Sequence, residues 1–174
     1  MLNIFVNTWG NYNENGADGG EWITLPMDPD ELEEKLEEIA ANMGDHDPEW
    51  AIHDYEWTTE WTGREIGEME SITELNEYIQ ALDDLEAWEQ ETYCAAVECW
   101  GFEYVSIEDI EDYNLYPDIQ SDYDLGYYWA EESGCYDLSG MGSLKNYIDY
   151  EAFGRDIRFE SDGGFTSLGW IERR

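Results

Sequence analysis

Positive charge is the feature that this sequence lacks most. Its 174 residues include 7 Lys plus Arg against 44 Asp plus Glu, a formal net charge of −37. Nucleic-acid binding needs a basic patch, and an anionic membrane surface would repel such a chain. We therefore expect neither a direct nucleic-acid contact nor a membrane contact. A protein partner rich in Lys and Arg fits this charge.

Other absences narrow the class further. The three cysteines, Cys94, Cys99 and Cys135, form no CxxC pair, which argues against a disulfide framework or a zinc site. The N-terminus shows no signal-peptide pattern, and no apolar run approaches the length of a membrane span. The sequence thus predicts a reduced, cytoplasmic protein with no cofactor.

Catalytic motifs are also missing. A phosphate-binding glycine loop is absent, and the pair His53–Asp54 has no G-x-S-x-G nucleophile motif to serve. Paired carboxylates occur throughout, so any one pair is a weak sign of a hydrolase. We predict that the protein is not an enzyme, with a carboxylate-based hydrolase as a competing hypothesis.

A calcium-dependent binding module is the main alternative function. Asn11, Asn13, Asn15 and Gly16 imitate the start of a calcium loop, but the position that needs Glu holds Trp22. The stretch 11–20 therefore favours a hairpin loop between two strands. Adaptation to high salt is a further explanation of the acidity.

The chain is rich in aromatic residues. Trp and Tyr number 9 and 13, and aromatics make up 16% of the residues, which disordered acidic segments do not show. Each large ring removes roughly 150–250 Å² from water when buried. We therefore predict a folded protein that tolerates strong self-repulsion.

Patterning predicts an α+β fold in three small domains. Strands are expected at 2–10, 21–26 and 49–57 and a helix at 28–43, where Asp28 caps and Pro29 takes the first position. These form a ββαβ-like N-terminal domain, 1–61. Capping patterns at Ser71 and Ser106 place a central helical domain at 62–105 and a C-terminal α+β domain at 106–174. In the last domain, helices are expected at 121–134 and 143–154, then a hairpin from Arg155 with SDGG as its turn.

The few cations gather near the C-terminus. Residues 145–174 hold five cations and six acids, a net of −1, so residues 1–144 hold 44 − 6 = 38 acids and two cations. Duplex DNA carries one charge per roughly 1.7 Å of axis, so 37 charges equal about 63 Å of duplex. Carboxylates held at that density on a folded scaffold would compete with phosphates for Lys and Arg side chains.

The stretch LKNYIDYEAFGRDI, residues 144–157, resembles the ArdA family of antirestriction proteins. Similar stretches are IFVNTWGNYNENGADGGEWITLP (4–26), AIHDYE (51–56), SITELN (71–76) and SDYDLGYYWAEESG (121–134). The resemblance implies a cytoplasmic DNA mimic of elongated three-domain form, typically encoded on a mobile genetic element. It further implies a homodimer that inhibits type I restriction-modification enzymes by occupying the DNA-binding groove of their specificity and modification subunits. No catalysis and no cofactor are implied.

Two sets of candidate residues follow. Acids spread over all three segments are expected to face the partner: Glu33, Glu34, Glu37, Glu38, Glu74, Glu77, Asp83, Glu86, Asp109, Glu111, Asp112, Asp122, Asp124 and Glu131. Residues of the family motif and its flank are expected to support dimerisation: Asn146, Tyr147, Tyr150, Phe153, Gly154, Arg155, Asp156 and Arg158. The competing interpretation pairs Arg155 and Arg158 with nearby acids of the same protomer, such as Asp156, Glu151 or Glu160.

Overall fold

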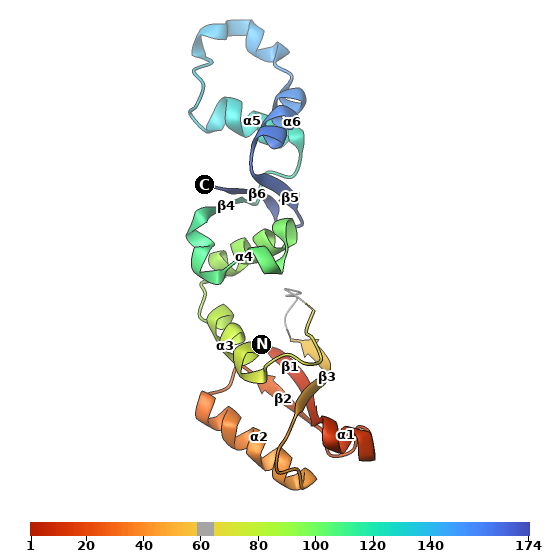
Figure 1. Cartoon of the computed structure of the whole chain (residues 1–174). Coiled ribbons are helices and arrows are strands. Elements are labelled where there is room, and N and C mark those ends of the chain that lie inside the picture. Colours follow the sequence, from red (N-terminus) through yellow and green to blue (C-terminus); the bar gives the residue numbers. More distant parts are fainter. Residues whose placement is uncertain (59–64) are drawn as a thin grey trace. The chain divides into compact units, whose positions relative to one another are not determined.

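A computed structural model describes residues 1–58 and 65–174, which fall into two compact units, Met1–Leu85 and Glu86–Arg174. Each unit contains a three-stranded antiparallel sheet with helices around it (Figure 1). The predicted α+β class is therefore confirmed. The two units divide inside the predicted central segment 62–105, and the three-domain, elongated form stays a prediction.

The sheet of the first unit has the order β2-β1-β3. Its strands are β1 (Leu2–Thr8), β2 (Glu21–Leu25) and β3 (Trp50–Trp57). Burial alternates along the first part of β1, where Leu2, Ile4 and Val6 are fully buried. This period of two shows that one face of the sheet packs against the core.

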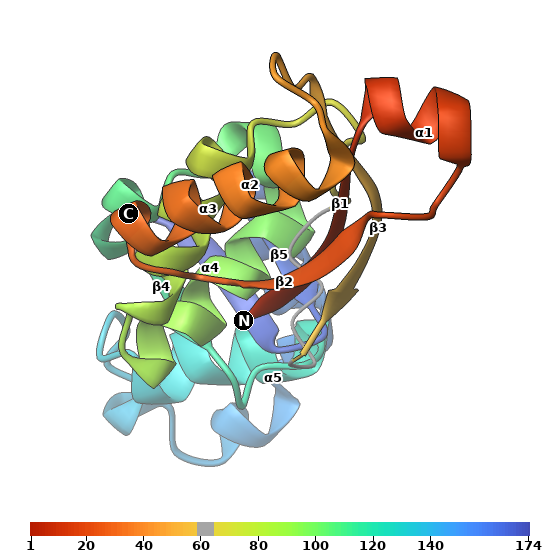
Figure 2. The same cartoon turned by 90° about the horizontal axis from the view of Figure 1, so that it is seen from below.

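Helices α2 (Pro29–Met43) and α3 (Ile72–Asp83) lie on the same side of this sheet (Figure 2). The predicted caps are present: the Asp28 side chain accepts from the Asp30 amide, and the Ser71 side chain accepts from the Glu74 amide. Both satisfy amide groups that a helix N-terminus otherwise leaves unpaired.

A buried amide joins α3 to the end of β2. Asn76 is 3% exposed, and its side chain accepts from the Met27 amide at 2.8 Å and donates to the Met27 carbonyl at 2.9 Å. Because both polar atoms of the amide are satisfied, the burial is not costly. The segment that leads into α2 is thereby held against α3.

Residues 11–20 connect the antiparallel strands β1 and β2 as predicted, but the connection is not a simple loop, because a short helix, α1 (Trp9–Asn15), follows β1 directly. Thr8 caps it by accepting from the Asn11 amide, and the Asn11 side chain donates to Asn7 and to the Asp18 carbonyl. Side chain-to-backbone bonds of this kind let Asn and Thr start a helix where turn propensity alone suggests a loop. Asn11, Asn13 and Asn15 thus lie on a helical turn rather than in a calcium loop.

The second unit begins with α4 (Ala87–Trp100), followed by 3-10 segments η1 (Phe102–Tyr104) and η2 (Ile107–Asp112). The strand β4 (Tyr113–Tyr116) comes next, then α5 (Asp122–Tyr127) with a π-helical continuation η3 (Tyr128–Glu132). The chain ends with the 3-10 segment η4 (Ser139–Tyr147), α6 (Tyr150–Glu160), β5 (Gly163–Thr166) and β6 (Gly169–Arg173).

The core of this unit is built around the sheet β4-β6-β5. Trp170 and Ile171 of β6 are fully buried, and Trp170 packs with Leu125 of α5 and Ile119. Helix α4 contacts all three strands. The expected aromatic core is present only in part, because Tyr93, Tyr113 and Trp170 are buried whereas other rings, such as those of Trp88, Tyr104 and Tyr147, are exposed.

The C-terminal hairpin is shorter than predicted. Residues 155–160 continue α6, where Ile157 packs on the core around Trp170, so the hairpin consists of β5 and β6 alone. Its turn lies between Thr166 and Gly169 rather than at SDGG. Gly169 has φ +129, a value that side chains rarely adopt, and the Thr166 hydroxyl donates to its carbonyl at 2.9 Å.

Helices α5 and α6 touch through two glycines. A Cβ atom on Gly154 would lie 1.7 Å from the Asp122 carbonyl oxygen, and one on Gly126 would lie 1.9 Å from that of Tyr150. Such distances are far inside van der Waals contact, so the two backbones meet directly. The glycine of the family motif thus has a structural reason: it permits this crossing.

We expect Gly154→Ala to destabilise the protein by about 3 kcal/mol or more, because the added methyl group must push two backbones apart. Gly140→Ala is the matched control, since a Cβ atom at Gly140 would point into open space, with no contact within 4 Å. This variant should shift stability by no more than about 0.5 kcal/mol. Urea unfolding measures both. Equal midpoints for the two variants would contradict the crossing.

Candidate acidic interaction surface

In the first unit, all predicted partner-facing acids are exposed on helices α2 and α3. They are Glu33, Glu34, Glu37, Glu38, Glu74, Glu77 and Asp83. A helix presents residues three and four apart on one face, so Glu33 and Glu37 share one side of α2 and Glu34 and Glu38 share another.

One cation reduces the charge on α2 locally. The Lys35 ammonium lies 2.9 Å from Glu21 and 3.3 Å from Glu38. Its hydrogen bonds to Glu21 and then to Glu38 raise the pKa of Lys35 above its usual value. Glu38 is therefore part of an internal ion pair, whereas Glu33 and Glu37 line a groove between α2 and α3.

In the second unit, the exposed predicted acids lie at helix starts and in the η2 segment. They are Glu86, Asp109, Glu111 and Asp112. Glu86 precedes α4, where its amide donates to Glu89 and its carboxylate accepts from the Trp88 indole. Acids at a helix N-terminus are favoured by the helix dipole, so Glu86 has a local role as well.

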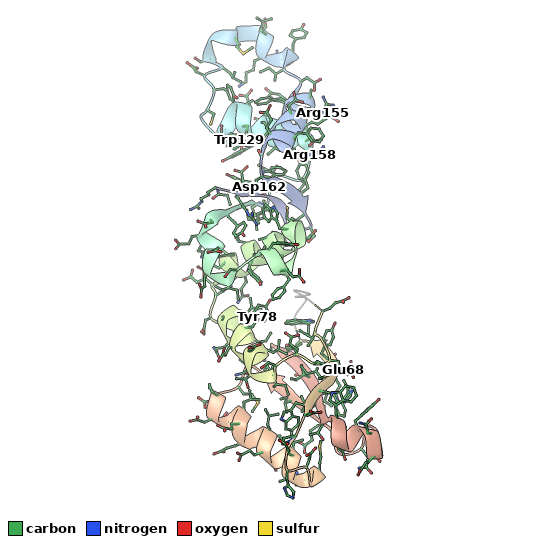
Figure 3. All side chains as sticks on the ribbon, viewed as in Figure 1. Glu68, Tyr78, Trp129, Arg155, Arg158 and Asp162 are labelled. Carbon is green, nitrogen blue, oxygen red and sulfur yellow. The ribbon has the colours of Figure 1, made fainter. Side chains whose placement is uncertain are left out.

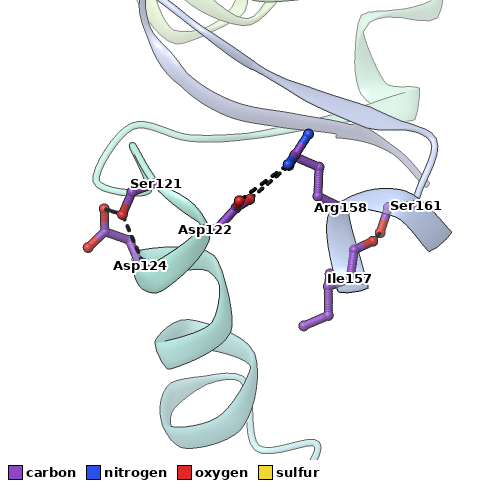
Figure 4. A network of polar contacts seen from close by, with 6 residues as sticks. All are labelled: Ser121, Asp122, Asp124, Ile157, Arg158 and Ser161. Atoms are coloured by element: carbon purple, nitrogen blue, oxygen red, sulfur yellow. Dashed lines mark hydrogen bonds and ion pairs between the residues drawn. The ribbon is translucent and has the colours of Figure 1, made fainter. Parts of the chain in front are cut away.

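Three further predicted acids of the second unit are half-buried and have partners inside the chain. Asp122 accepts two hydrogen bonds from Arg158 of α6, at 2.8 and 3.2 Å (Figure 4). Asp124 accepts from the Ser121 hydroxyl at 2.6 Å, and the Ser121 hydroxyl caps α5 by accepting from the Asp124 amide. The Arg158 pair is bidentate, the strongest geometry for such a contact, and joins α5 to α6.

Glu131 is the third of these acids, and its side chain is only 9% exposed. It accepts hydrogen bonds from Lys145 and from the Tyr150 hydroxyl. The bond from Lys145, and then that from Tyr150, hold the pKa of Glu131 below its usual value; the same contact with Glu131 raises the pKa of Tyr150 to about 12. This carboxylate connects three segments of the fold.

The candidate residues of the family motif occupy different environments. Gly154 is buried at the helix crossing and Tyr150 bonds to Glu131, while Phe153 meets Tyr136 edge to face with ring centroids 5.7 Å apart. The remaining members are exposed or engaged with α5: Asn146, Tyr147, Arg155 and Asp156 are exposed, and Arg158 pairs with Asp122.

The C-terminal cations are mostly used within the unit. Arg173 lies over the rings of Trp100 and Tyr113, and Arg174 donates to Asn114 at 2.8 Å. Arg155 differs, because it is exposed on α6 without an ion-pair partner among the described residues (Figure 3). The hypothesis that these arginines pair with acids of the same protomer thus holds for Arg158, although its partner is Asp122 rather than one of the nearby acids. Within the described ranges it does not hold for Arg155.

Several features escaped sequence reasoning. The groove between α2 and α3, the glycine contact of Gly126 and the contact of Lys145 with Glu131 all join residues distant in sequence. Gly126, which interrupts the helical pattern of 121–134, was the sequence feature that could have indicated the close contact of α5 with α6.

The competing sites have ordinary structural explanations. His53 stacks on Tyr12 with centroids 4.1 Å apart, and its Nδ1 lies 3.1 Å from Glu68, so it is held by packing and an acid rather than by a nucleophile. Across residues 1–58 and 65–174, no three His, Cys, Asp or Glu side chains come together as metal ligands would. None of the helices in these ranges has the length and apolarity to cross a bilayer.

Taken together, the structure is that of an α+β protein whose two units both carry exposed carboxylates. A family model described as antirestriction protein (ArdA) matches residues 4–172, nearly the whole chain, and the chain belongs to this family. The resemblance found in the sequence is thereby confirmed, and membership of this family implies an antirestriction function. Comparison with curated proteins found no significant match.

The Glu131 contacts make a pH-dependent prediction. A lowered carboxyl pKa means stabilisation that is present above its ordinary value of 4.5 and is lost as the pH falls through the lowered value. We expect Glu131→Gln to have a lower melting temperature than wild type at pH 7. The difference between the two melting temperatures should become smaller below about pH 4.

Glu132→Gln is the matched control, because it removes the same charge from an exposed neighbouring position. Melting curves across the pH range, recorded by circular dichroism, give the comparison. If the two variants had the same melting temperature at pH 7, the structural role of Glu131 would be refuted.

Proposed function

We propose that this protein inhibits type I restriction-modification enzymes by occupying their DNA-binding groove as a mimic of DNA. Family membership supports the antirestriction role and a type I enzyme as the target. The observation that carries the mechanism is a set of exposed carboxylates on both units that form no ion pair with any described residue, Glu33, Glu37, Glu77 and Asp109 among them.

The chemistry of the target fits this surface. A DNA-binding groove presents Lys and Arg side chains at phosphate positions, and carboxylates accept the same charge-assisted hydrogen bonds as phosphates. Since phosphate contacts carry no sequence information, a mimic of the backbone acts on enzymes with different target sequences. The specificity and modification subunits, which hold the DNA, are the proposed contact, and the cytoplasm is the proposed location.

Not every acid has this role in the proposal. Asp122, Asp124 and Glu131 are bonded within the second unit, so we assign them to the fold. The partner-facing set is then the exposed group on α2, α3, the start of α4 and η2. Because each exposed contact is worth only about 0.2–1 kcal/mol, binding depends on many of them together.

Self-association is the second part of the proposal. Two chains of net charge −37 repel each other, so a contact between copies needs a surface with fewer free acids. The exposed side chains of the segment from η4 to α6 include Tyr147, Phe159 and the cation Arg155, beside the acids Glu151, Asp156 and Glu160. Aromatic and Arg residues are enriched in protein interfaces, which supports a homodimer through this region.

Competition with DNA tests the mechanism. With a type I methyltransferase bound to labelled DNA, the unlabelled protein should displace the DNA, and the concentration required should rise in proportion to the DNA concentration. Glu77→Gln alone should change this concentration less than about fivefold, whereas combined replacement of Glu33, Glu34, Glu37 and Glu38 should weaken it stepwise. Loss of all displacement on one replacement would support a localised site instead.

Sedimentation tests the dimer surface. At about 0.15 M salt, where charges beyond roughly 8 Å are screened, we expect wild type to dimerise and Tyr147→Ser and Arg155→Glu to raise the dimer dissociation constant roughly tenfold or more. Tyr104→Ser is the matched control, because Tyr104 is 71% exposed and Tyr147 is 83% exposed. Identical dimerisation of all three variants would exclude this surface.

A further inference from the structure

A groove runs between helices α2 and α3 in the first unit. Its volume is about 790 Å³, within the range of pockets that enclose a bound group. Leu36, Ala40 and Trp50 contribute apolar surface to it, and Ala40 and Ala41 leave it open because their side chains are small.

The groove follows the axis of α2. Pro29, Glu33, Leu36 and Ala40 line it at helical spacing, and Asp45 continues the lining beyond the helix end. Fifteen helical residues span about 22 Å, and the lining residues of α2 run from Pro29 to Ala41, so the lining extends along most of this helix. A long apolar channel suits a second helix better than a compact small molecule.

The acidic residues that line the groove indicate what kind of segment can bind in it. Asp30, Glu33, Glu37, Asp45 and Glu77 line the groove, and the described residues of its lining include no Lys or Arg. A segment entering here must bring cations to face these acids and apolar groups to cover Leu36 and Trp50. Lys and Arg side chains combine an apolar stem with a charged head, which matches both demands.

We propose that this groove binds a basic amphipathic helix of the restriction-modification enzyme. The helix places apolar side chains three and four positions apart along the apolar channel and Lys or Arg side chains against the acidic rim. This inference rests on the proposed function and adds to it a shaped contact, which electrostatic mimicry alone does not require.

The proposal also divides the four glutamates of α2 by role. Glu33 and Glu37 line the groove and Glu34 does not, while Glu38 pairs with Lys35. A purely electrostatic surface would weight equal charges on one helix equally. A groove contact predicts unequal effects from equal changes in charge.

Filling the groove is the sharpest test. Ala41 is exposed on α2 and lines the groove, so Ala41→Trp adds bulk without changing charge. In the assay that displaces labelled DNA from a purified type I methyltransferase, we expect Ala41→Trp to need at least about tenfold more protein than wild type. The loss should persist at higher salt, because steric blocking is not screened.

A matched pair of double variants supplies the control. Glu33→Gln/Glu37→Gln removes two charges from the groove, and Glu31→Gln/Glu34→Gln removes two from α2 outside it. The first pair should weaken displacement at least about threefold more than the second. Far-ultraviolet circular dichroism and melting temperatures confirm that each variant is folded.

Each outcome has one meaning. Wild-type potency in folded Ala41→Trp, or equal effects of the two double variants, would overturn the groove contact while leaving DNA mimicry in place. Failure of the wild-type protein to displace DNA would instead overturn the proposed function. A photo-crosslinker at position 41 should capture a methyltransferase segment that carries Lys or Arg and apolar residues at helical spacing; capture of an acidic or extended segment would count against the helix.

Discussion

Mutual repulsion among carboxylates is the constraint on which the rest of this structure depends. With a formal net charge of −37, every stable contact has to be made where negative charge is kept away or balanced. The apolar interiors of both units meet this demand with fully buried residues such as Ile4 and Trp170. The few cations balance buried or half-buried acids where segments of the fold pack together. Arg158 connects α6 to α5 through Asp122, and Lys145 forms an ion pair with Glu131.

At the surface, the same carboxylates can bind the cations of another protein. Carboxylates that the fold does not pair are available to the cations of another protein, which is the property that a DNA mimic needs. The second unit contains both kinds of acid. Asp122 and Glu131 are bonded to other residues of the unit, whereas Asp109 and Glu111 are exposed. The exposed carboxylates that form no internal bond are the ones that we propose to bind the partner.

Much of the fold was predictable because its signals are local. The cap at Asp28, the proline after it and the apolar stripe of α2 lie within one stretch, and the helix forms where they indicate. Helix α1, the end of α6 and the hairpin turn were missed because side-chain bonds and packing of Ile157 on a distant core decide them. For the candidate site, the sequence identified acidic residues but not their partners, since the contact of Asp122 with Arg158 spans 36 positions.

Salt dependence tests the central claim most directly. DNA loses affinity for its proteins as salt rises, because the contacts are those of phosphates with cations. If carboxylates of this protein replace phosphates in the same groove, the dissociation constant of its complex with a type I methyltransferase, measured by calorimetry or fluorescence between about 0.05 and 0.5 M salt, should rise steeply and in parallel with that of DNA. A dissociation constant that stays flat, or falls, across that range would contradict electrostatic mimicry.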